Sequence, residues 1–223
     1  MSKELVAFLS GFVSDTRLKR FDELIQFRTR HITVVLEDIY QTHNASAVLR
    51  SCDCFGVQDV HIIENKNKYE LNPDVELGSH KWLTLRNYNK KENNTLDCIR
   101  SLKKNGYNII ATTPHKNDCS IHELDITRRT AIVFGTELKG ITDAVGEEAD
   151  GFVKIPMYGF TESFNISVSA AICLYELTTR MRNSDLHWEL SPEEKLSIKL
   201  EWLRNSLTKP ELIEEEFIRK YKS

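Results

Sequence analysis

The sequence predicts an α/β protein built on a mostly parallel sheet with helices on both faces. Short β-branched apolar runs, such as Ile32–Ile39 and Thr130–Gly135, are typical of buried strands. Stretches with a helical spacing of apolar residues stand between these runs, for example Ala45–Phe55. Strands that alternate with helices along a chain form parallel sheets whose two faces are both covered.

The individual elements follow in chain order. Residues 3–29 predict one or two amphipathic helices, a segment too short to bury a core of its own. The helix expected over 45–55 has Asn44 as its N-cap and Gly56 as its stop. Further strands are expected at 57–65, 82–85, 107–114 and 151–157, and further helices at 96–104 and 143–148. The segment 115–129 predicts little structure of its own.

The most informative stretch is Ile155–Leu177. It begins as a strand, passes through a polar loop that contains Gly159, and becomes a long apolar helix with Asn165 as the expected N-cap. One interpretation is an ordinary strand-loop-helix unit. The other is a ligand-binding loop, because a helix start presents unpaired backbone N–H groups.

Two further helices are expected near the C-terminus. Ser191-Pro192-Glu193-Glu194 has the capping-box pattern with proline at the first helical position, and Pro210 marks a second start. Their apolar stripes must pack on the main domain or on a second subunit, because neither helix is stable alone in water. The predicted organisation is a helical extension over 1–30, a main domain over 31–183 and a second helical extension over 184–223.

Composition narrows the class of protein. The chain has 223 residues, of which 40% are hydrophobic and 28% charged, as in globular proteins. No apolar run approaches the ~20 residues of a membrane span, and the start lacks a convincing cleavage site, so we expect a cytoplasmic protein without a membrane partner. The cysteines form no C-x-x-C pair and the histidines no H-E-x-x-H, so we expect no metal site. The net charge of −3 argues against a strongly basic nucleic-acid-binding surface, although basic residues do cluster locally.

The loop after the strand at 130–135 is the first candidate ligand site. Gly135 and Gly140 are spaced as in a P-loop, but Ile141 and Thr142 stand where that motif needs a lysine and a hydroxyl residue. No G-x-G-x-x-G follows a strand, so ATP and NAD are poor candidates. What remains is a glycine-bordered loop at the carboxyl end of a strand, beside the loop that contains Gly159. Such loops form ligand crevices in open α/β sheets.

Three segments together resemble the motifs of a known family. His43–Val57 (HNASAVLRSCDCFGV), Ile132–Thr142 (IVFGTELKGIT) and the stretch from Ile155 (IPMYGFTESFNISVSAAICLYE) are similar, in this order, to the three motifs of the SpoU/TrmH family of RNA ribose 2′-O-methyltransferases. The resemblance covers roughly Arg30 to Arg182. It implies a C-terminal trefoil knot, S-adenosylmethionine as cofactor, and a homodimer formed through the knotted region with the active site near the interface.

The resemblance also implies site residues. The implied cofactor contacts are Thr112, Gly135, Glu137, Ile155, Met157, Ser163 and Phe164. Phe164 replaces the leucine usual in the family. The implied catalytic group comprises Asn44, Arg50, Glu137, Ser163 and Asn165. Asn44 could serve as N-cap and site residue at once, and Ile155 and Met157 could be core residues as well as cofactor contacts.

Arg50 matches the arginine for which the family implies a role as general base. An arginine side chain has a reference pKa of about 12.5 or above, so neutralising it near pH 7 costs roughly 7 kcal/mol. We therefore favour a guanidinium that binds the RNA phosphate bidentately and stabilises developing negative charge. Water or a transiently deprotonated Arg50 would then accept the proton. Without the motif, Arg50 would be interpreted as a surface residue.

The family modifies transfer RNA or ribosomal RNA. The short terminal helices and the segment around the first motif most resemble the branch that methylates guanosine 18 in the D-loop of tRNA. Two alternatives stay open: a ribosomal RNA 2′-O-methyltransferase, and an RNA-binding factor that keeps the fold without catalysis.

Overall fold

The computed structural model describes residues 2–69, 75, 77–113, 119–136 and 140–221. The chain divides into two compact units. The larger is Thr29–Trp188, and the smaller combines Met1–Arg28 with Glu189–Ser223. Within the described ranges, no helix has both the length and the apolar character to cross a membrane.

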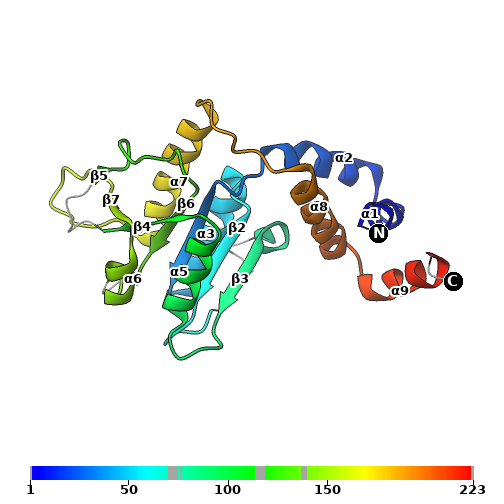
Figure 1. Cartoon of the computed structure of the whole chain (residues 1–223), viewed down its shortest axis with the longest axis horizontal. Coiled ribbons are helices and arrows are strands. Elements are labelled where there is room, and N and C mark those ends of the chain that lie inside the picture. The colour runs from blue at the N-terminus through cyan, green and yellow to red at the C-terminus, as the bar shows by residue number, and fades with distance from the viewer. Residues whose placement is uncertain (1, 70–74, 76, 114–118, 137–139, 222–223) are drawn as a thin grey trace. The chain divides into compact units, whose positions relative to one another are not determined.

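The larger unit contains a seven-stranded parallel sheet in the order β3-β2-β1-β6-β4-β7-β5 (Figure 1). The strands are β1 (Ile32–Glu37), β2 (Asp59–Ile63), β3 (Thr84–Tyr88), β4 (Asn108–Thr112), β5 (Cys119–Ser120), β6 (Thr130–Phe134) and β7 (Gly151–Lys154). Both β1 and β6 are buried along their whole length, because each lies between two other strands and is covered on both faces. This explains their continuous β-branched and apolar sequences.

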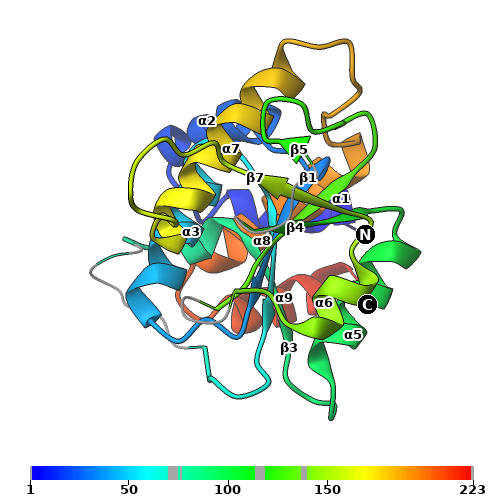
Figure 2. The ribbon, with the colours of Figure 1, turned by 90° about the vertical axis from the view of Figure 1, so that its left-hand side faces the viewer.

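Helices cover both faces of the sheet (Figure 2). On one face, α3 (Thr42–Phe55) and α7 (Ile166–Arg182) pack against each other and against the side chains of Ile32, Val34 and Leu36. On the other face, α5 (Asn94–Lys104) and α6 (Asp143–Glu148) contribute to a second cluster that includes Val35, Ala131 and Val133. The alternation of side chains along β1 and β6 therefore supplies both cores. The predicted fold class is confirmed.

The order of the strands differs from their order in the sequence. The late strand β6 pairs between β1 and β4, and β7 pairs between β4 and β5. Both strands thus lie between strands that precede them in the chain. This arrangement is compatible with the trefoil knot that the family resemblance implies, and the knot itself stays a prediction.

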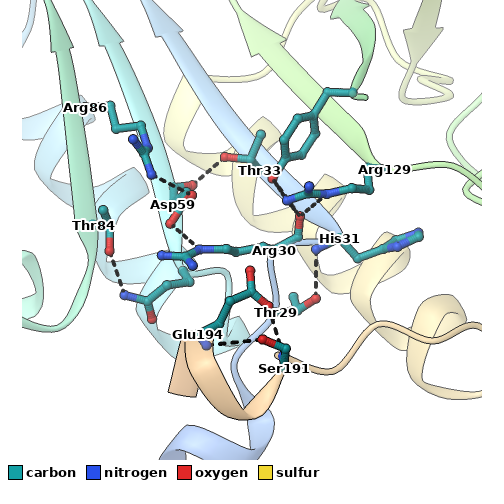
Figure 3. Close-up of polar contacts among 12 residues, drawn as sticks. Thr29, Arg30, His31, Thr33, Asp59, Thr84, Arg86, Arg129, Ser191 and Glu194 are labelled. Carbon is teal, nitrogen blue, oxygen red and sulfur yellow. Dashed lines mark hydrogen bonds and ion pairs between the residues drawn. The ribbon is translucent and has the colours of Figure 1, made fainter. Parts of the chain in front are cut away.

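The amino ends of the strands carry an ion cluster in which Asp59 is buried and Arg86 is half exposed. Figure 3 shows Asp59, at the start of β2, between Arg30 and Arg86, with N···O distances of 3.0 and 3.6 Å. The Tyr107 hydroxyl donates to the carbonyl of Arg30 at 2.7 Å, and the guanidinium of Arg129 lies 4.2 Å from the Tyr107 ring centroid. Burial raises the pKa of Tyr107 to about 12. This network fixes the amino edge of the sheet, while the opposite edge carries the cleft described below.

The smaller unit is helical. It comprises α1 (Ser2–Ser10), α2 (Asp15–Leu24), a 3₁₀ turn (Ile25–Phe27), α8 (Pro192–Ser206) and α9 (Pro210–Tyr221). Both α8 and α9 contact α1, so the helices from the two ends of the chain pack together. The ring centroids of Phe8 and Phe217 are 5.4 Å apart, as are those of Phe21 and Trp202. From the sequence we expected these helices to pack on the main domain or on a second subunit. The structure shows that they pack on α1.

The predicted capping box of α8 is confirmed. The Ser191 hydroxyl accepts a hydrogen bond from the backbone N–H of Glu194 at 3.2 Å, and the Glu194 carboxylate accepts one from the backbone N–H of Ser191 at 2.9 Å. Pro192 occupies the first helical position. The Arg204 guanidinium then joins α8 to Glu214 of α9 through two hydrogen bonds of 2.6 and 3.0 Å.

Three expectations about local structure were wrong. The helix α3 begins at Thr42, with Gln41 as its N-cap, so Asn44 lies inside the first turn and does not cap the helix. A short strand, β5, occurs in the segment expected to have little structure, because Cys119 and Ser120 pair with β7. The strand β7 ends at Lys154, so Ile155, Pro156 and Met157 already belong to the following loop.

Candidate active site

A cleft of about 910 Å³ opens at the carboxyl ends of the central strands. Its floor includes Thr112, Phe134 and Val153, which lie at or near the ends of β4, β6 and β7. Its walls come from the loops that follow β6 and β7 and from the first turns of α3, α6 and α7. Parallel strands place the segments that follow them at one edge of the sheet, which is why loops distant in sequence meet here.

The described ends of the loop after β6 lie close together. Thr136 and Gly140 exchange two backbone hydrogen bonds of 2.8 and 2.9 Å. A Cβ atom on Gly135 would lie 2.2 Å from the carbonyl oxygen of Gly140, so only glycine fits at that position. Gly140 has a φ of 67°, in the left-handed region that glycine favours. The two glycines of the second motif thus shape this wall of the cleft.

The loop after β7 leads into α7 through the predicted N-cap. The Asn165 side-chain oxygen accepts hydrogen bonds from the backbone N–H of Ser167 at 2.8 Å and from its hydroxyl at 2.6 Å. The prediction that Asn165 caps this helix is confirmed. The side-chain oxygen of Asn165 thus caps the helix, and its amide nitrogen can donate to another element.

That donor connects the third motif to the first. The side-chain amide of Asn165 donates to the side-chain oxygen of Asn44 at 3.1 Å, and the amide of Asn44 donates to Gln41 at 3.0 Å. Asn44 is almost fully buried at 1% exposure. Its position in the first turn of α3 thus serves the contact between two helices, in place of the capping role expected from the sequence.

The lining of the cleft combines apolar and polar groups. Ile141, Ile155 and Met157 provide apolar surface, and Asp143 and Glu147 provide carboxylates. The buried thiol of Cys173 also lines the cleft, and burial raises its pKa to about 12. This cysteine therefore stays protonated near neutral pH and acts as an apolar surface rather than as a nucleophile.

Eight of the ten site residues expected from the sequence line this cleft: Asn44, Thr112, Gly135, Ile155, Met157, Ser163, Phe164 and Asn165. Glu137 lies outside the described residues. Arg50 is exposed on α3 and is not among the described residues that line the cleft. It follows Asn44 by six residues, a rise of about 9 Å along a helix, and points to a different side of α3.

Sequence reasoning missed one wall of the cleft. Asp143, Gly146 and Glu147 lie on α6 and line the cleft together with its N-cap, Thr142. Their spacing of three and four residues places them on one helical face, which is a signal that the sequence does contain. The short helix carries no motif of its own, however, so nothing in the sequence distinguished that face from a solvated one.

Fold and cleft together define an α/β protein with a ligand-sized cleft at the carboxyl edge of its sheet. The family model described as "SpoU rRNA Methylase family" matches residues 31–175. That range is more than half of the chain; it includes the first two motifs and the third as far as Tyr175. The protein belongs to this family.

Several named proteins are similar over nearly the whole chain. A tRNA (guanosine(18)-2'-O)-methyltransferase of Borreliella burgdorferi is 43% identical over 209 residues, covering 94% of each chain. An enzyme of the same name from Thermus thermophilus is 33% identical and covers 86% of this chain and 97% of its own. The crystal structure of the A. aeolicus TrmH/SpoU tRNA modifying enzyme has a TM-score of 0.77 at 31% identity, covering 87% of this chain and 98% of that one.

Proposed function

We propose that the protein transfers a methyl group from S-adenosylmethionine to the ribose 2′-hydroxyl of guanosine 18 in the D-loop of tRNA. The observation that carries this proposal is that all three motifs reach one region at the carboxyl edge of the sheet, with residues of each lining the cleft. The similarity to enzymes named for this reaction, which extends over 94% of both chains in the B. burgdorferi case, supports the choice of substrate.

The residues of the cleft fit the cofactor. Its volume of about 910 Å³ lies within the range of about 300–1,000 Å³ that small-molecule sites occupy. Ile155, Met157 and Phe164 offer apolar surface suited to an adenine ring, and Thr112 and Ser163 offer hydroxyls for its sugar. The absence of a Cβ at Gly135 lets the backbone of Gly140 and Ile141 pack against it, which shapes this wall of the cleft. When bound, S-adenosylmethionine supplies an electrophilic methyl group on a sulfonium.

The chain's own residues supply binding and alignment. The Asn165–Asn44 hydrogen bond fixes the start of α7 relative to α3, so that the cofactor side and the RNA side of the cleft keep one geometry. Holding two reactants in line can contribute about 7–11 kcal/mol to catalysis. Arg50 provides a permanent positive charge that binds the RNA phosphate and stabilises the charge that develops on the ribose oxygen. Glu137 completes the catalytic group expected from the motif.

We further propose a homodimer in which the partner covers α7. Val168 and Tyr175 on this helix are 44% and 61% exposed, and small residues stand between them. Exposed apolar side chains on one helical face are typical of an interface. Arg50 does not line the cleft of its own chain. In a dimer, it could instead reach the cleft of the partner subunit. Sedimentation velocity should give a dimer for the native chain and a monomer for Tyr175→Glu.

The cytoplasmic location expected from the sequence is consistent with this substrate.

The proposed function is tested with purified protein, labelled S-adenosylmethionine and two tRNA transcripts. A transcript with guanosine 18 should accept the methyl group, and the same transcript with a 2′-deoxyguanosine at that position should accept none. Methylation of both would refute the site assignment, because it would show transfer to another nucleotide.

A second candidate is a ribosomal RNA 2′-O-methyltransferase. It is favoured by similarity to a 23S rRNA (guanosine-2'-O-)-methyltransferase of Shewanella oneidensis, 30% identical over 73% of this chain but over only 65% of that protein. Fragments of 23S rRNA in the same assay decide between the two. A protein that binds tRNA and methylates neither RNA would instead be a non-catalytic RNA-binding factor.

A further inference from the structure

A buried carboxylate lies just behind the cleft. Glu37 is the last residue of β1 and has no exposed surface. It is not among the residues that line the cleft. A buried carboxylate is costly unless hydrogen bonds replace its lost hydration, so its partners show what it holds.

Glu37 receives three hydrogen bonds from two separate segments. One carboxylate oxygen accepts from the hydroxyls of Thr95 and Thr142, each at 2.7 Å. The other oxygen accepts from the backbone N–H of Thr142 at 3.2 Å. Thr95 belongs to the first turn of α5, and Thr142 is the N-cap of α6. Glu37 therefore ties the start of both helices to the centre of the sheet.

The direction of these hydrogen bonds is fixed by their neighbours. The Thr95 hydroxyl also accepts from the side-chain amide of Asn65 at 2.9 Å, and the Thr142 hydroxyl accepts from the backbone N–H of Val145 at 3.4 Å. Each hydroxyl has a single proton, which it gives to Glu37. All three contacts thus need an acceptor at Glu37, which a carboxylate provides on both oxygens and a carboxamide on only one.

Of the two threonines, only Thr142 belongs to the cleft. It follows directly on Gly140 and Ile141 and precedes Asp143, all of which line the cleft. The wall formed by this loop and α6 is therefore joined at Thr142 to a rigid central strand. Thr95 makes an equal contact with the same oxygen but is not among the lining residues.

We propose that Glu37 is a positioning residue for the methyl-transfer reaction: through Thr142 it holds the cofactor-side wall of the cleft in its binding geometry. This proposal rests on the proposed function. Glu37 contacts neither reactant. Its loss acts on cofactor affinity and leaves RNA affinity unchanged, because the wall it supports is formed by the loop after β6 and by α6.

The test compares Glu37→Gln with Thr95→Val, which breaks a matched hydrogen bond away from the cleft. The Kd of S-adenosylmethionine is measured by calorimetry. The KM values of the cofactor and of tRNA are measured by steady-state kinetics of methyl transfer. We expect Glu37→Gln to raise the cofactor Kd and KM by about tenfold, the scale of one lost charged hydrogen bond, with the KM of tRNA within twofold of the native value. Thr95→Val should leave both values within twofold.

A second pair of variants keeps the test decisive if Glu37→Gln does not fold. Thr142→Ser keeps the hydroxyl donor and should bind the cofactor as the native chain does, whereas Thr142→Val cannot donate and should lose about the same factor as Glu37→Gln.

Two outcomes would overturn the proposal. One is an equal rise of the KM values of cofactor and tRNA, and the other is an equal effect of Thr95→Val and Glu37→Gln. Native protein that binds no S-adenosylmethionine at all would refute the proposed function instead, so the two failures are distinguishable.

Discussion

The side-chain amide of Asn165 donates a hydrogen bond of 3.1 Å to the side-chain oxygen of Asn44, joining two residues that are 121 positions apart in the sequence. Asn165 begins α7, and Asn44 lies in the first turn of α3. Because both residues line the cleft, this bond connects the first motif to the third inside the candidate active site.

A double-mutant cycle should detect this connection. Asn44→Ala and Asn165→Ala each remove one partner, and a neutral hydrogen bond contributes about 0.5–1.5 kcal/mol. We expect each single variant to lower the single-turnover rate of methyl transfer, and the double variant to fall short of the product of the two losses by a factor of about 3–10. Independent, multiplicative losses would show that the two side chains do not act together.

Arg50→Ala should separate catalysis from folding and cofactor binding. Arg50 is exposed, so its truncation should change the free energy of unfolding by less than about 0.5 kcal/mol. It is not among the lining residues of the cleft, so the cofactor Kd should stay unchanged. Methyl transfer should fall by at least about 100-fold, the scale of one lost group that stabilises transition-state charge.

Arg50→Lys is the matched control for this prediction. Lysine keeps the positive charge but not the planar bidentate geometry, so its activity should lie between those of the native chain and Arg50→Ala. Native turnover in Arg50→Ala would remove this residue from the mechanism.

Gly135→Ala should disrupt the cleft. The added Cβ would lie 2.2 Å from the carbonyl oxygen of Gly140, so the backbone at Gly135 and Gly140 must move apart, at a cost of about 1–3 kcal/mol. Calorimetry should show weakened binding of S-adenosylmethionine. Urea denaturation should show a lower free energy of unfolding. Gly159→Ala is the matched control, because the nearest atom to its added Cβ is 4.0 Å away. Equal behaviour of the two variants would contradict the close approach of Gly135 and Gly140.

Acid should destabilise the larger unit through His61. Burial, together with the nearby positive charge of Arg86, lowers the pKa of His61 from 6.5 to about 3 in the folded chain. The unfolded chain binds a proton between these values and the folded chain does not. The stabilisation is therefore complete above pH 6.5 and is lost as the pH falls toward 3. Between pH 7 and pH 5, the titration of His61 should lower the free energy of unfolding by about 2 kcal/mol.

His61→Gln checks the origin of this pH dependence. Glutamine does not titrate, and its amide can replace the hydrogen bond of 3.0 Å between His61 Nδ1 and the Tyr88 hydroxyl. The free energy of unfolding is measured by urea denaturation at pH 7 and pH 5. The difference between the two pH values should be smaller in the variant than in the native chain by about 2 kcal/mol. An unchanged difference would assign the acid sensitivity to other groups.

Local sequence patterns were sufficient for much of this protein. The β-branched runs at β1 and β6, the capping box at Ser191 and the N-cap at Asn165 follow from interactions between residues close in the chain. Such interactions depend on side-chain shape and hydrogen-bonding capacity, which the sequence states directly. Together with the three motifs, they were enough for the fold class and for eight of the lining residues.

Tertiary structure decided what depends on contacts between distant segments. The burial of Glu37 between Thr95 and Thr142, the bond between Asn44 and Asn165, and the packing of α8 and α9 on α1 all join positions far apart in sequence. No local pattern encodes them, because the same residues could satisfy their hydrogen-bonding and apolar groups in many other ways. Only the folded chain, which brings these distant segments side by side, selects one of these ways.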